Sequence, residues 1–286
     1  MNKSENTKMP ANRKKEEVRP RRDFAQYWLR DERILHKILE AAQLVPSDRI
    51  LEIGPGTGIL TRKILPWVQY LVAVEIDRNL CKKIVKEIGS KENFLLLQGD
   101  FLDLDLQPLL TGIPVEDKRL NKVVANIPYN ITGPIIEKLL GKISSPNEER
   151  YESIVLLVQK EVAQRLTAKP GTKAFGALSV RVQYLAACEM ICNVPSQAFY
   201  PPPKVESAVI RLTPRIFATQ AKDPKKLETI VKLGFGSKRK MLRNNLQSII
   251  DRDEFIALME KLGINSQVRG EDLSVTEWVR LANELV

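Results

Sequence analysis

The sequence predicts an α/β fold with a mostly parallel sheet, followed by a small all-helical C-terminal domain. From Arg49 onward, short β-rich runs alternate with amphipathic helical stretches, which is typical of βαβ units. A glycine-rich turn directly follows the first of these runs, at a position where such sheets bind ligands. Beyond about residue 225 only helical periodicity remains. The 286 residues agree with two domains, since one domain takes about 150 residues.

The elements can be assigned in order along the chain. Five apolar runs are expected to form the parallel strands: 49–54, 71–75, 94–98, 122–125 and 153–158. Helices are expected at 59–67, 78–88, 133–141 and 160–168. Three later runs predict strands that extend the sheet, antiparallel at one edge: 178–186, 190–194 and 205–212. A proline-containing linker at 213–224 precedes helices at 225–235, 238–250, 252–262 and 274–285. We therefore expect an arm over residues 1–22, an α/β domain over 23–213 and a helical domain over 214–286.

The net charge of +10 favours a polyanionic partner. Half of the surplus lies in residues 1–22, whose composition predicts a disordered arm that either solubilises the protein or contacts RNA. The other half lies in residues 232–243, where a basic helix start would face phosphates. The candidate RNA-binding residues are Lys238, Arg239, Lys240 and Arg243. The alternative for this second segment is a solvated helix face.

Several classes of protein are disfavoured by composition. The three cysteines contain no Cys-x-x-Cys pair and predict reduced thiols in the cytoplasm. The single histidine, His36, argues against a metal site and against a histidine-assisted nucleophile. Apolar runs stay below the roughly 18 residues of a membrane span, and the basic, polar N-terminal residues without an apolar run after them do not predict a secretory signal. We therefore expect a cytoplasmic protein without metal or membrane.

A glycine loop from Gly54 to Gly58 follows the first strand, Glu75 ends the second strand, and Asp100 follows the third. These residues should meet, because the carboxyl ends of parallel strands share one edge of the sheet. Gly-x-Gly-x-x-Gly is the motif typical of a dinucleotide site. Here the third glycine comes one residue early, and Pro55 lacks a backbone N–H. The spacing favours S-adenosylmethionine, an adenosine that carries an amino acid. A dinucleotide, or a glycine turn used only for packing, remains the alternative.

The fourth strand ends in Asn126-Ile127-Pro128-Tyr129. The N6 nitrogen of adenine is a poor nucleophile because its lone pair is delocalised into the ring. The Asn126 side-chain oxygen and the Ile127 carbonyl could each accept one N6 hydrogen and so stabilise the positive charge that develops during methylation. Pro128 would orient that carbonyl, and the Tyr129 ring could stack on the base. The alternative is an Asn-Pro turn that closes a strand.

Taken together, these segments resemble the rRNA adenine N6-dimethyltransferase family, and most closely its small-subunit branch. The resemblance rests on Glu52–Gly58, Val74–Asp77, Gly99–Asp100, Asn126–Tyr129, Gln159–Val162 and Phe199–Ala208, and it extends through Phe235–Asn244 in the helical domain. It implies a Rossmann-like S-adenosylmethionine-dependent methyltransferase sheet whose helical domain binds RNA or the ribosome. It also implies dimethylation of two adjacent adenosines near the 3′ end of 16S rRNA, by a monomer acting on the small-subunit precursor late in assembly.

The resemblance also implies roles for particular residues. The residues expected to line the cofactor site are Leu29, Gly54, Gly56, Glu75, Asp100 and Asn126. Tyr129 and Phe199 would sandwich the adenine. At Phe24–Leu29 the family usually has Phe-Gly-Gln-Asn-Phe-Leu, so Tyr27 replaces an asparagine that contacts the cofactor, and its ring could cover the cofactor instead.

Three rival functions remain open at this point. The large-subunit branch of the family shares the Asn-x-Pro-Tyr element, although the triple proline at 201–203 and the basic C-terminal segment favour the small-subunit branch. An assembly checkpoint that binds immature small subunits is compatible with methylation. A dinucleotide-dependent oxidoreductase is the third possibility.

Overall fold

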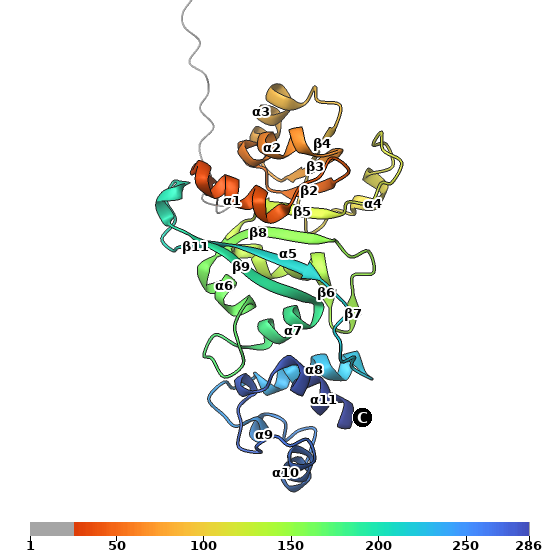
Figure 1. The fold of residues 1–286 in the computed structure, drawn as a ribbon, viewed down its shortest axis with the longest axis vertical. Helices are drawn as coiled ribbons and strands as arrows, with labels where there is room; N and C mark the ends of the chain where they lie inside the picture. Colours follow the sequence, from red (N-terminus) through yellow and green to blue (C-terminus); the bar gives the residue numbers. More distant parts are fainter. Residues whose placement is uncertain (1–25, 286) are drawn as a thin grey trace, which may run out of the picture.

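A seven-stranded mixed sheet forms the centre of the structure, a computed structural model that describes residues 26–285 (Figure 1). Its strand order is β4-β3-β2-β5-β8-β11-β9. The strands are β2 (Arg49–Ile53), β3 (Tyr70–Glu75), β4 (Phe94–Gln98), β5 (Lys122–Asn126), β8 (Ser153–Gln159), β9 (Ala186–Val194) and β11 (Ser207–Pro214). Strands β4, β3, β2, β5 and β8 pair in parallel, whereas β11 is antiparallel to both β8 and β9. The predicted parallel sheet with an antiparallel edge is confirmed, and the predicted arm at 1–22 lies outside the described residues.

Helices cover both faces of this sheet because its strands are apolar on both sides. Successive residues alternate between the faces: Leu51 belongs to one hydrophobic cluster and Ile50 to the other. Helices α1 (Glu32–Ala42), α2 (Ile59–Ile64) and α3 (Arg78–Ile88) contribute to the Ile50 cluster. Helices α5 (Thr132–Leu140), α6 (Lys160–Leu166) and α7 (Ala177–Leu185) contribute to the Leu51 cluster. A further short helix is α4 (Leu106–Leu109).

The strand expected over 178–186 is wrong, because residues 177–185 form helix α7. The alternating valines of this segment mimic a strand, but the turn before it begins a helix. The Gly176 N–H donates to Ser179 Oγ at 3.0 Å, and that hydroxyl donates to the Arg165 carbonyl at 2.5 Å. Val180 and Val182 are then buried between the sheet and the helical domain. Tertiary packing therefore overrides the local β preference.

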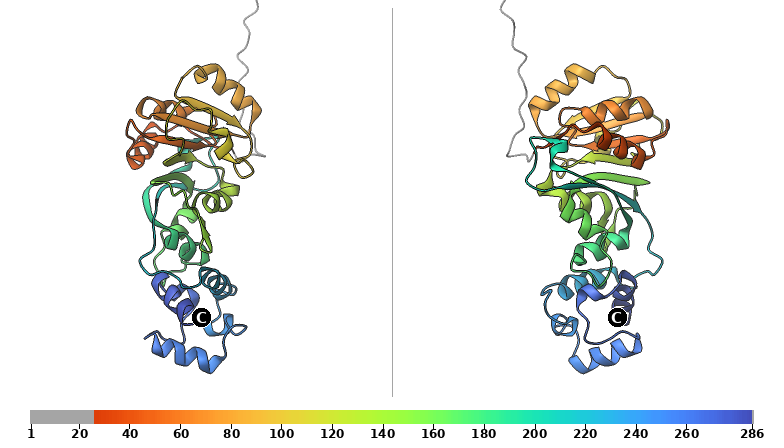
Figure 2. Two further views of the ribbon diagram at one scale, coloured as in Figure 1. Left: turned by 90° about the vertical axis from the view of Figure 1, so that its right-hand side faces the viewer. Right: turned by 60° about the vertical axis from the view of Figure 1, so that its left-hand side comes forward.

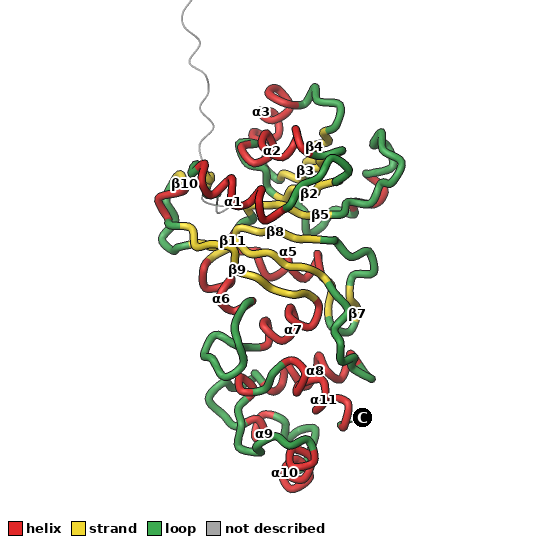
Figure 3. The backbone as a smooth tube through the Cα atoms, in the orientation of Figure 1, coloured by secondary structure: helices red, strands yellow, loops and turns green. Residues whose placement is uncertain are grey.

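A small second sheet joins two segments that are far apart in the sequence. Strand β1 (Trp28–Leu29) pairs antiparallel with β10 (Phe199–Tyr200), with Leu29 opposite Phe199. The Arg30 N–H extends this pairing by donating to the Ala198 carbonyl at 2.7 Å. Figure 3 shows β10 beside α1, near the edge of the large sheet. The pairing places the N-terminal segment next to the ends of the parallel strands.

The C-terminal helices lie at the end of the molecule opposite α3, as Figures 1 and 2 show. They are α8 (Pro224–Gly234), α9 (Leu242–Asn245), α10 (Arg252–Lys261) and α11 (Val275–Glu284). Three aromatic side chains connect these helices to the segment before α7. The Phe235 ring centroid lies 6.5 Å from that of Phe175 and 5.5 Å from that of Trp278. The predicted domain limits at 213 and 214 remain a prediction.

The helix expected over 238–250 is wrong for most of its length, because only α9 is helical there. The Asn245 side chain donates to the Gly234 carbonyl at 2.7 Å and to the Ser237 carbonyl at 3.1 Å. These bonds satisfy carbonyls that a continuous helix would use, so residues 235–241 form a turn. Within the described residues, no helix is long and apolar enough to cross a membrane.

Candidate active site

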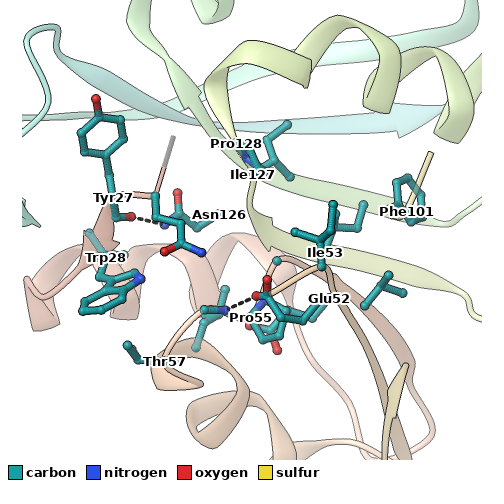
Figure 4. Close-up of a pocket in the computed structure, with 18 of the residues that line it drawn as sticks. Tyr27, Trp28, Glu52, Ile53, Pro55, Thr57, Phe101, Asn126, Ile127 and Pro128 are labelled. Atoms are coloured by element: carbon teal, nitrogen blue, oxygen red, sulfur yellow. Dashed lines mark hydrogen bonds between the residues drawn. The ribbon is translucent and has the colours of Figure 1, made fainter. Parts of the chain in front are cut away.

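A pocket lies at the carboxyl ends of β2, β3, β4 and β5, between the glycine loop and the N-terminal segment (Figure 4). Gly54 and Gly56 have positive φ angles of 67° and 57°, which an L side chain adopts only with strain. A methyl group on Gly54 would lie 3.9 Å from the Asn126 carbonyl oxygen and from Pro128 Cδ. The loop therefore approaches the Asn126–Tyr129 segment closely, as the shared sheet edge predicts.

The Glu75 carboxylate organises the loop. Its Oε2 accepts from the Gly56 N–H at 3.0 Å, and its Oε1 accepts from the Asp77 N–H at 2.9 Å. Burial raises the pKa of Glu75, although these two backbone N–H groups oppose the rise. A carboxylate has about four acceptor positions, so two remain available for the hydroxyls of a ribose.

Two further carboxyl groups line the same pocket. Asp100 accepts from the Leu102 N–H at 2.9 Å through one oxygen, which orients the other carboxylate oxygen. Glu52 is 1% exposed, and burial raises its pKa to about 8, with the nearby Glu75 carboxylate adding to the rise. Glu52 is therefore mostly protonated at neutral pH. Its Oε2 atom is buried and has no hydrogen-bond partner among the described residues.

The side chain of Asn126 is held by the N-terminal segment. Its Nδ2 donates to the Tyr27 carbonyl at 3.1 Å, a contact that spans 99 residues of sequence. Figure 4 shows this bond and shows the Tyr27 ring pointing away from the glycine loop. Tyr27 thus contacts Asn126 through its main chain. The neighbouring Ile127 side chain is buried in the Leu51 cluster, which anchors the backbone of the tetrapeptide.

The Tyr129 ring lies at the pocket and is held at both ends. Its hydroxyl hydrogen-bonds with Ser207 Oγ at 2.5 Å, and its ring stacks on the Tyr27 ring with centroids 5.4 Å apart and planes inclined by 24°. Burial raises the pKa of Tyr129 to about 12, so the phenol is neutral at physiological pH. Tyr129 is therefore a neutral aromatic surface that a base could contact.

The remaining predicted residues lie in two different environments. Leu29 is buried at 3% exposure and lines the pocket, on the strand that pairs with β10. Phe199 sits opposite Leu29 but is 4% exposed, packs in the Ile50 cluster and is absent from the residues that line the pocket. Stacking of Phe199 on a substrate base therefore stays a prediction, and it would require movement of β10.

The predicted RNA-binding residues lie far from this pocket, in the turn and short helix after α8. Lys238, Arg239 and Lys240 are exposed and Arg243 is half-buried. Lys238 Nζ also donates to the carbonyls of Lys173 and Phe175, at 3.2 and 3.4 Å. Lys238 therefore connects the turn after α8 to residues 173–175 in addition to presenting charge.

The pocket fits an adenosine that carries an amino acid. Carboxylates at Glu75 and Asp100 can accept from ribose and adenine donors, and the apolar Ile76 and Phe101 side chains lie beside them. Trp28 Nε1 and Glu52 Oε2 are buried polar atoms of the lining without partners among the described residues. No group of three or more candidate metal ligands occurs in residues 26–285.

Sequence reasoning missed Trp28, Glu52 and Gln26 as pocket residues. Glu52 carried a usable signal, since it is the lone acidic residue within the apolar strand β2. Gln26 donates to Asp77 Oδ2 at 3.4 Å, a contact of two segments 51 residues apart. Trp28 and Gln26 reach the pocket through tertiary contacts that no local pattern reveals.

Comparisons with known proteins show the family of this chain. Residues 18–286 match the family described as ribosomal RNA adenine dimethylase. The chain is 66% identical over 268 residues to the ribosomal RNA small subunit methyltransferase A of Trichormus variabilis, covering 94% of this chain and 98% of the relative. It is 52% identical to the protein of the same name from Synechocystis, covering 93% and 96%.

Two solved structures share the fold over most of the chain. A dimethyladenosine transferase from Plasmodium falciparum is 25% identical, with a TM-score of 0.71 and coverage of 89% of this chain and 95% of that chain. The 23S rRNA methyltransferase ErmE is 26% identical, with a TM-score of 0.71 and coverage of 90% and 99%. These findings decide for S-adenosylmethionine over a dinucleotide. The chain belongs to the ribosomal RNA adenine dimethylase family and is an S-adenosylmethionine-dependent rRNA methyltransferase.

Proposed function

We propose that this enzyme transfers methyl groups to N6 of two adjacent adenosines near the 3′ end of 16S rRNA and dimethylates each of them. In this proposal it acts in the cytoplasm, as a monomer, on the precursor of the small ribosomal subunit late in its assembly. The support for the small-subunit target is the name of the relatives, which is shared by proteins 52% to 66% identical to this chain. The support for adenine N6 is the Asn126–Tyr129 segment.

The observation that carries the chemical part is the hydrogen bond between Asn126 and Tyr27. Because the amide nitrogen donates to the Tyr27 carbonyl, the opposite atom of this planar group, Oδ1, is left to accept from a substrate. S-adenosylmethionine supplies an electrophilic methyl group on its sulfonium. Asn126 Oδ1 and the Ile127 carbonyl would hold the N6 hydrogens, two at the first transfer and one at the second, and orient the nitrogen lone pair toward that methyl. At each transfer the nitrogen–carbon bond would form as the carbon–sulfur bond breaks, S-adenosylhomocysteine would leave, and one N6 proton would pass to water. As neutral acceptors, both also stabilise the positive charge that develops on nitrogen.

Pro128 and Tyr129 position these groups. Pro128 has φ −59° and ψ 133°, an extended conformation that ends β5 and lets the chain turn into the pocket. The Tyr129 ring would support the extruded base, a contact worth about 1–3 kcal/mol per base. The role of Phe199 as a second stacking partner is proposed on the family resemblance alone.

Methyl transfer to defined substrates tests this function. We expect tritiated methyl groups to enter undermethylated small subunits, with less transfer to free 16S rRNA and little to mature particles. Primer extension on the labelled RNA should stop at two adjacent adenosines near the 3′ end. Equal or greater labelling of 23S rRNA would contradict the proposal and favour the large-subunit target named for the similar structure of ErmE.

The assembly-checkpoint alternative calls for a separate experiment. An Asn126→Ala protein keeps the surfaces that bind the ribosome but should lose methyl transfer. If this variant restores growth of a strain that lacks the enzyme as well as the wild type does, binding is the main function. If it fails while being present at the same level, methylation is required.

A further inference from the structure

The indole N–H of Trp28 lies in the cofactor pocket without an acceptor. Trp28 lines the pocket, and its Nε1 atom is buried with no hydrogen-bond partner among the described residues. Figure 4 shows the indole beside the glycine loop, with its nitrogen on the side of the ring that faces the pocket. A buried N–H group is nearly always paired in a folded protein, because an unpaired donor costs about 1–3 kcal/mol. The unpaired donor therefore indicates a position that a ligand atom completes.

The position of this indole is well determined by its neighbours. On one side, the Tyr27 carbonyl accepts from Asn126; on the other, the Arg30 N–H donates to Ala198. Trp28 itself pairs with Tyr200 in the small sheet. A methyl group on Gly56 would lie 3.4 Å from Trp28 Cδ1 and 3.6 Å from Nε1, so the ring rests against the glycine loop. The N–H group is held in place before any ligand binds.

The chemistry of the pocket indicates which ligand atom accepts this hydrogen. The lining contains the carboxyl groups of Glu52, Glu75 and Asp100, and none of its described residues is a lysine, an arginine or a histidine. These carboxyl groups suit ligand donors such as ribose hydroxyls, whereas the amino-acid end of S-adenosylmethionine carries an anionic carboxylate that needs donors.

Most side-chain donors near the N-terminal segment already have acceptors. The Gln26 amide donates to Asp77, and the Asn126 amide donates to Tyr27. The Tyr129 hydroxyl hydrogen-bonds with Ser207. Two buried polar atoms of this lining have no partner among the described residues, Glu52 Oε2 and Trp28 Nε1, and of these Trp28 belongs to the N-terminal segment.

We propose that Trp28 is a cofactor-binding residue whose Nε1–H donates to the carboxylate of the amino-acid end of S-adenosylmethionine. The indole occupies the position next to Tyr27, where the family resemblance leads one to expect asparagine followed by phenylalanine. In this chain the N–H group at this place comes from a ring that rests against the glycine loop at Gly56. This inference uses the cofactor and does not depend on which RNA is methylated.

Calorimetric titration of the full chain with two ligands tests this role. S-adenosylhomocysteine carries the amino-acid carboxylate, and 5′-methylthioadenosine lacks the whole amino-acid end. Trp28→Phe removes the N–H but keeps an aromatic ring, so we expect its Kd for S-adenosylhomocysteine to rise about 10- to 100-fold. Its Kd for 5′-methylthioadenosine should stay within about twofold of the wild-type value. Trp67→Phe, at an exposed tryptophan, is the matched control and should change neither constant.

Two outcomes of the titration would overturn the proposal: an unchanged Kd for S-adenosylhomocysteine, or an equal rise for both ligands, which would assign Trp28 to packing alone. A second measurement uses the wild-type protein and so does not depend on how the variant folds. Among the indole N–H resonances of the three tryptophans, that of Trp28 should shift downfield with S-adenosylhomocysteine. With 5′-methylthioadenosine it should stay in place, and a similar shift with both ligands would contradict the assignment.

Discussion

The two walls of the pocket are built in different ways. The sheet-edge wall consists of Gly54, Glu75, Asp100 and Asn126, each of which ends a parallel strand or follows one within two residues. The N-terminal wall consists of Gln26–Leu29, which precedes α1 and belongs to the small sheet. The sheet-edge wall is positioned by strand pairing between neighbours. The N-terminal wall is positioned by contacts with residues about 50 to 170 positions away, at Asp77, Asn126 and Ala198.

The two walls therefore differ in how strongly the chemistry of the ligand restricts their side chains. The sheet-edge wall offers acceptors that any ligand with ribose and adenine donors needs. The N-terminal wall uses its backbone carbonyl at Tyr27 to orient Asn126, so the Tyr27 side chain is less restricted than those of the sheet-edge wall. Tyr27 and Trp28 both differ from the pattern that the family resemblance leads one to expect, and in this chain the Tyr27 carbonyl accepts from Asn126. Substitutions on the two walls should therefore have unequal consequences.

The largest effect is expected at the junction of the two walls, with Asn126→Ala. Loss of one preorganised acceptor should lower kcat by roughly 10²–10³-fold, by analogy with the loss of a single oxyanion-hole donor. Cofactor affinity should be retained, because the glycine loop and Glu75 are unchanged. Single-turnover methylation together with calorimetry separates the two quantities. Unchanged turnover would refute the proposed role of Asn126.

Glu52→Gln tests the buried carboxyl beneath the sheet-edge wall. Its folded-state pKa of about 8 lies above the ordinary value, so the wild-type group binds a proton in the folded state that the unfolded chain releases. Because of this bound proton, the unfolding free energy falls by about 1.4 kcal/mol per pH unit between roughly pH 5 and pH 8, and the decrease levels off above that range. The glutamine variant lacks this pH dependence, because glutamine does not titrate. Urea unfolding from pH 6 to 9 should show that the unfolding free energy of the variant rises relative to that of the wild type as pH rises. If the unfolding free energies of the two proteins depend on pH in the same way, the raised pKa of Glu52 is contradicted.

Gly56→Ala disturbs the contact between the two walls. The positive φ angle costs an L residue about 1–2 kcal/mol, and the added methyl would lie in van der Waals contact with Trp28 Cδ1 at 3.4 Å. We expect cofactor affinity to fall about tenfold. Gly112→Ala is the control, since a methyl there meets no atom within 4 Å. If both variants bind S-adenosylhomocysteine equally well, the loop is less constrained than its geometry indicates.

Tyr27→Ala removes a side chain of the N-terminal wall while leaving the carbonyl that holds Asn126. Loss of the stacked pair with Tyr129, worth about 0.5–1.5 kcal/mol, should reduce methyl transfer no more than about tenfold. Tyr27→Phe should behave like the wild type because it keeps the stacking. A loss as large as that of Asn126→Ala would show that the side chain, and not the backbone, is the important part of this residue.

The smallest effect is expected outside both walls, in the basic turn. Arg239→Ala combined with Lys240→Ala should reduce the slope of log affinity against log salt by about 1.5 if each side chain contacts one phosphate. Lys238 is left intact because it bridges to Lys173 and Phe175. The control replaces two exposed lysines of α3, Lys82 and Lys86, with the same change in charge. An equal slope for the two double variants would assign the turn to general solvation.

Prediction from sequence succeeded where local pattern and fold agree. Strands β2 to β5 and β8 lie within a residue or two of their expected limits, because continuous apolar runs are typical of strands buried on both faces. It failed at 178–186, where valine alternation suggested a strand, and at 238–250, where the chain turns and the Asn245 side chain bonds to the Gly234 and Ser237 carbonyls. In both cases a polar side chain and the surrounding core outweighed the local preference.

The sequence alone determined where the parallel strands begin and end along the chain and which acidic and glycine residues lie at their carboxyl ends, and it favoured S-adenosylmethionine over a dinucleotide. These follow from short-range spacing, since a residue that ends a parallel strand must lie at one sheet edge. The tertiary structure alone decided that β1 pairs with β10, that Phe199 is buried, and that the Tyr27 carbonyl and the Trp28 indole complete the pocket. Such contacts join segments separated by about 100 residues or more, and their partners are selected by packing of the whole core, which no local pattern encodes.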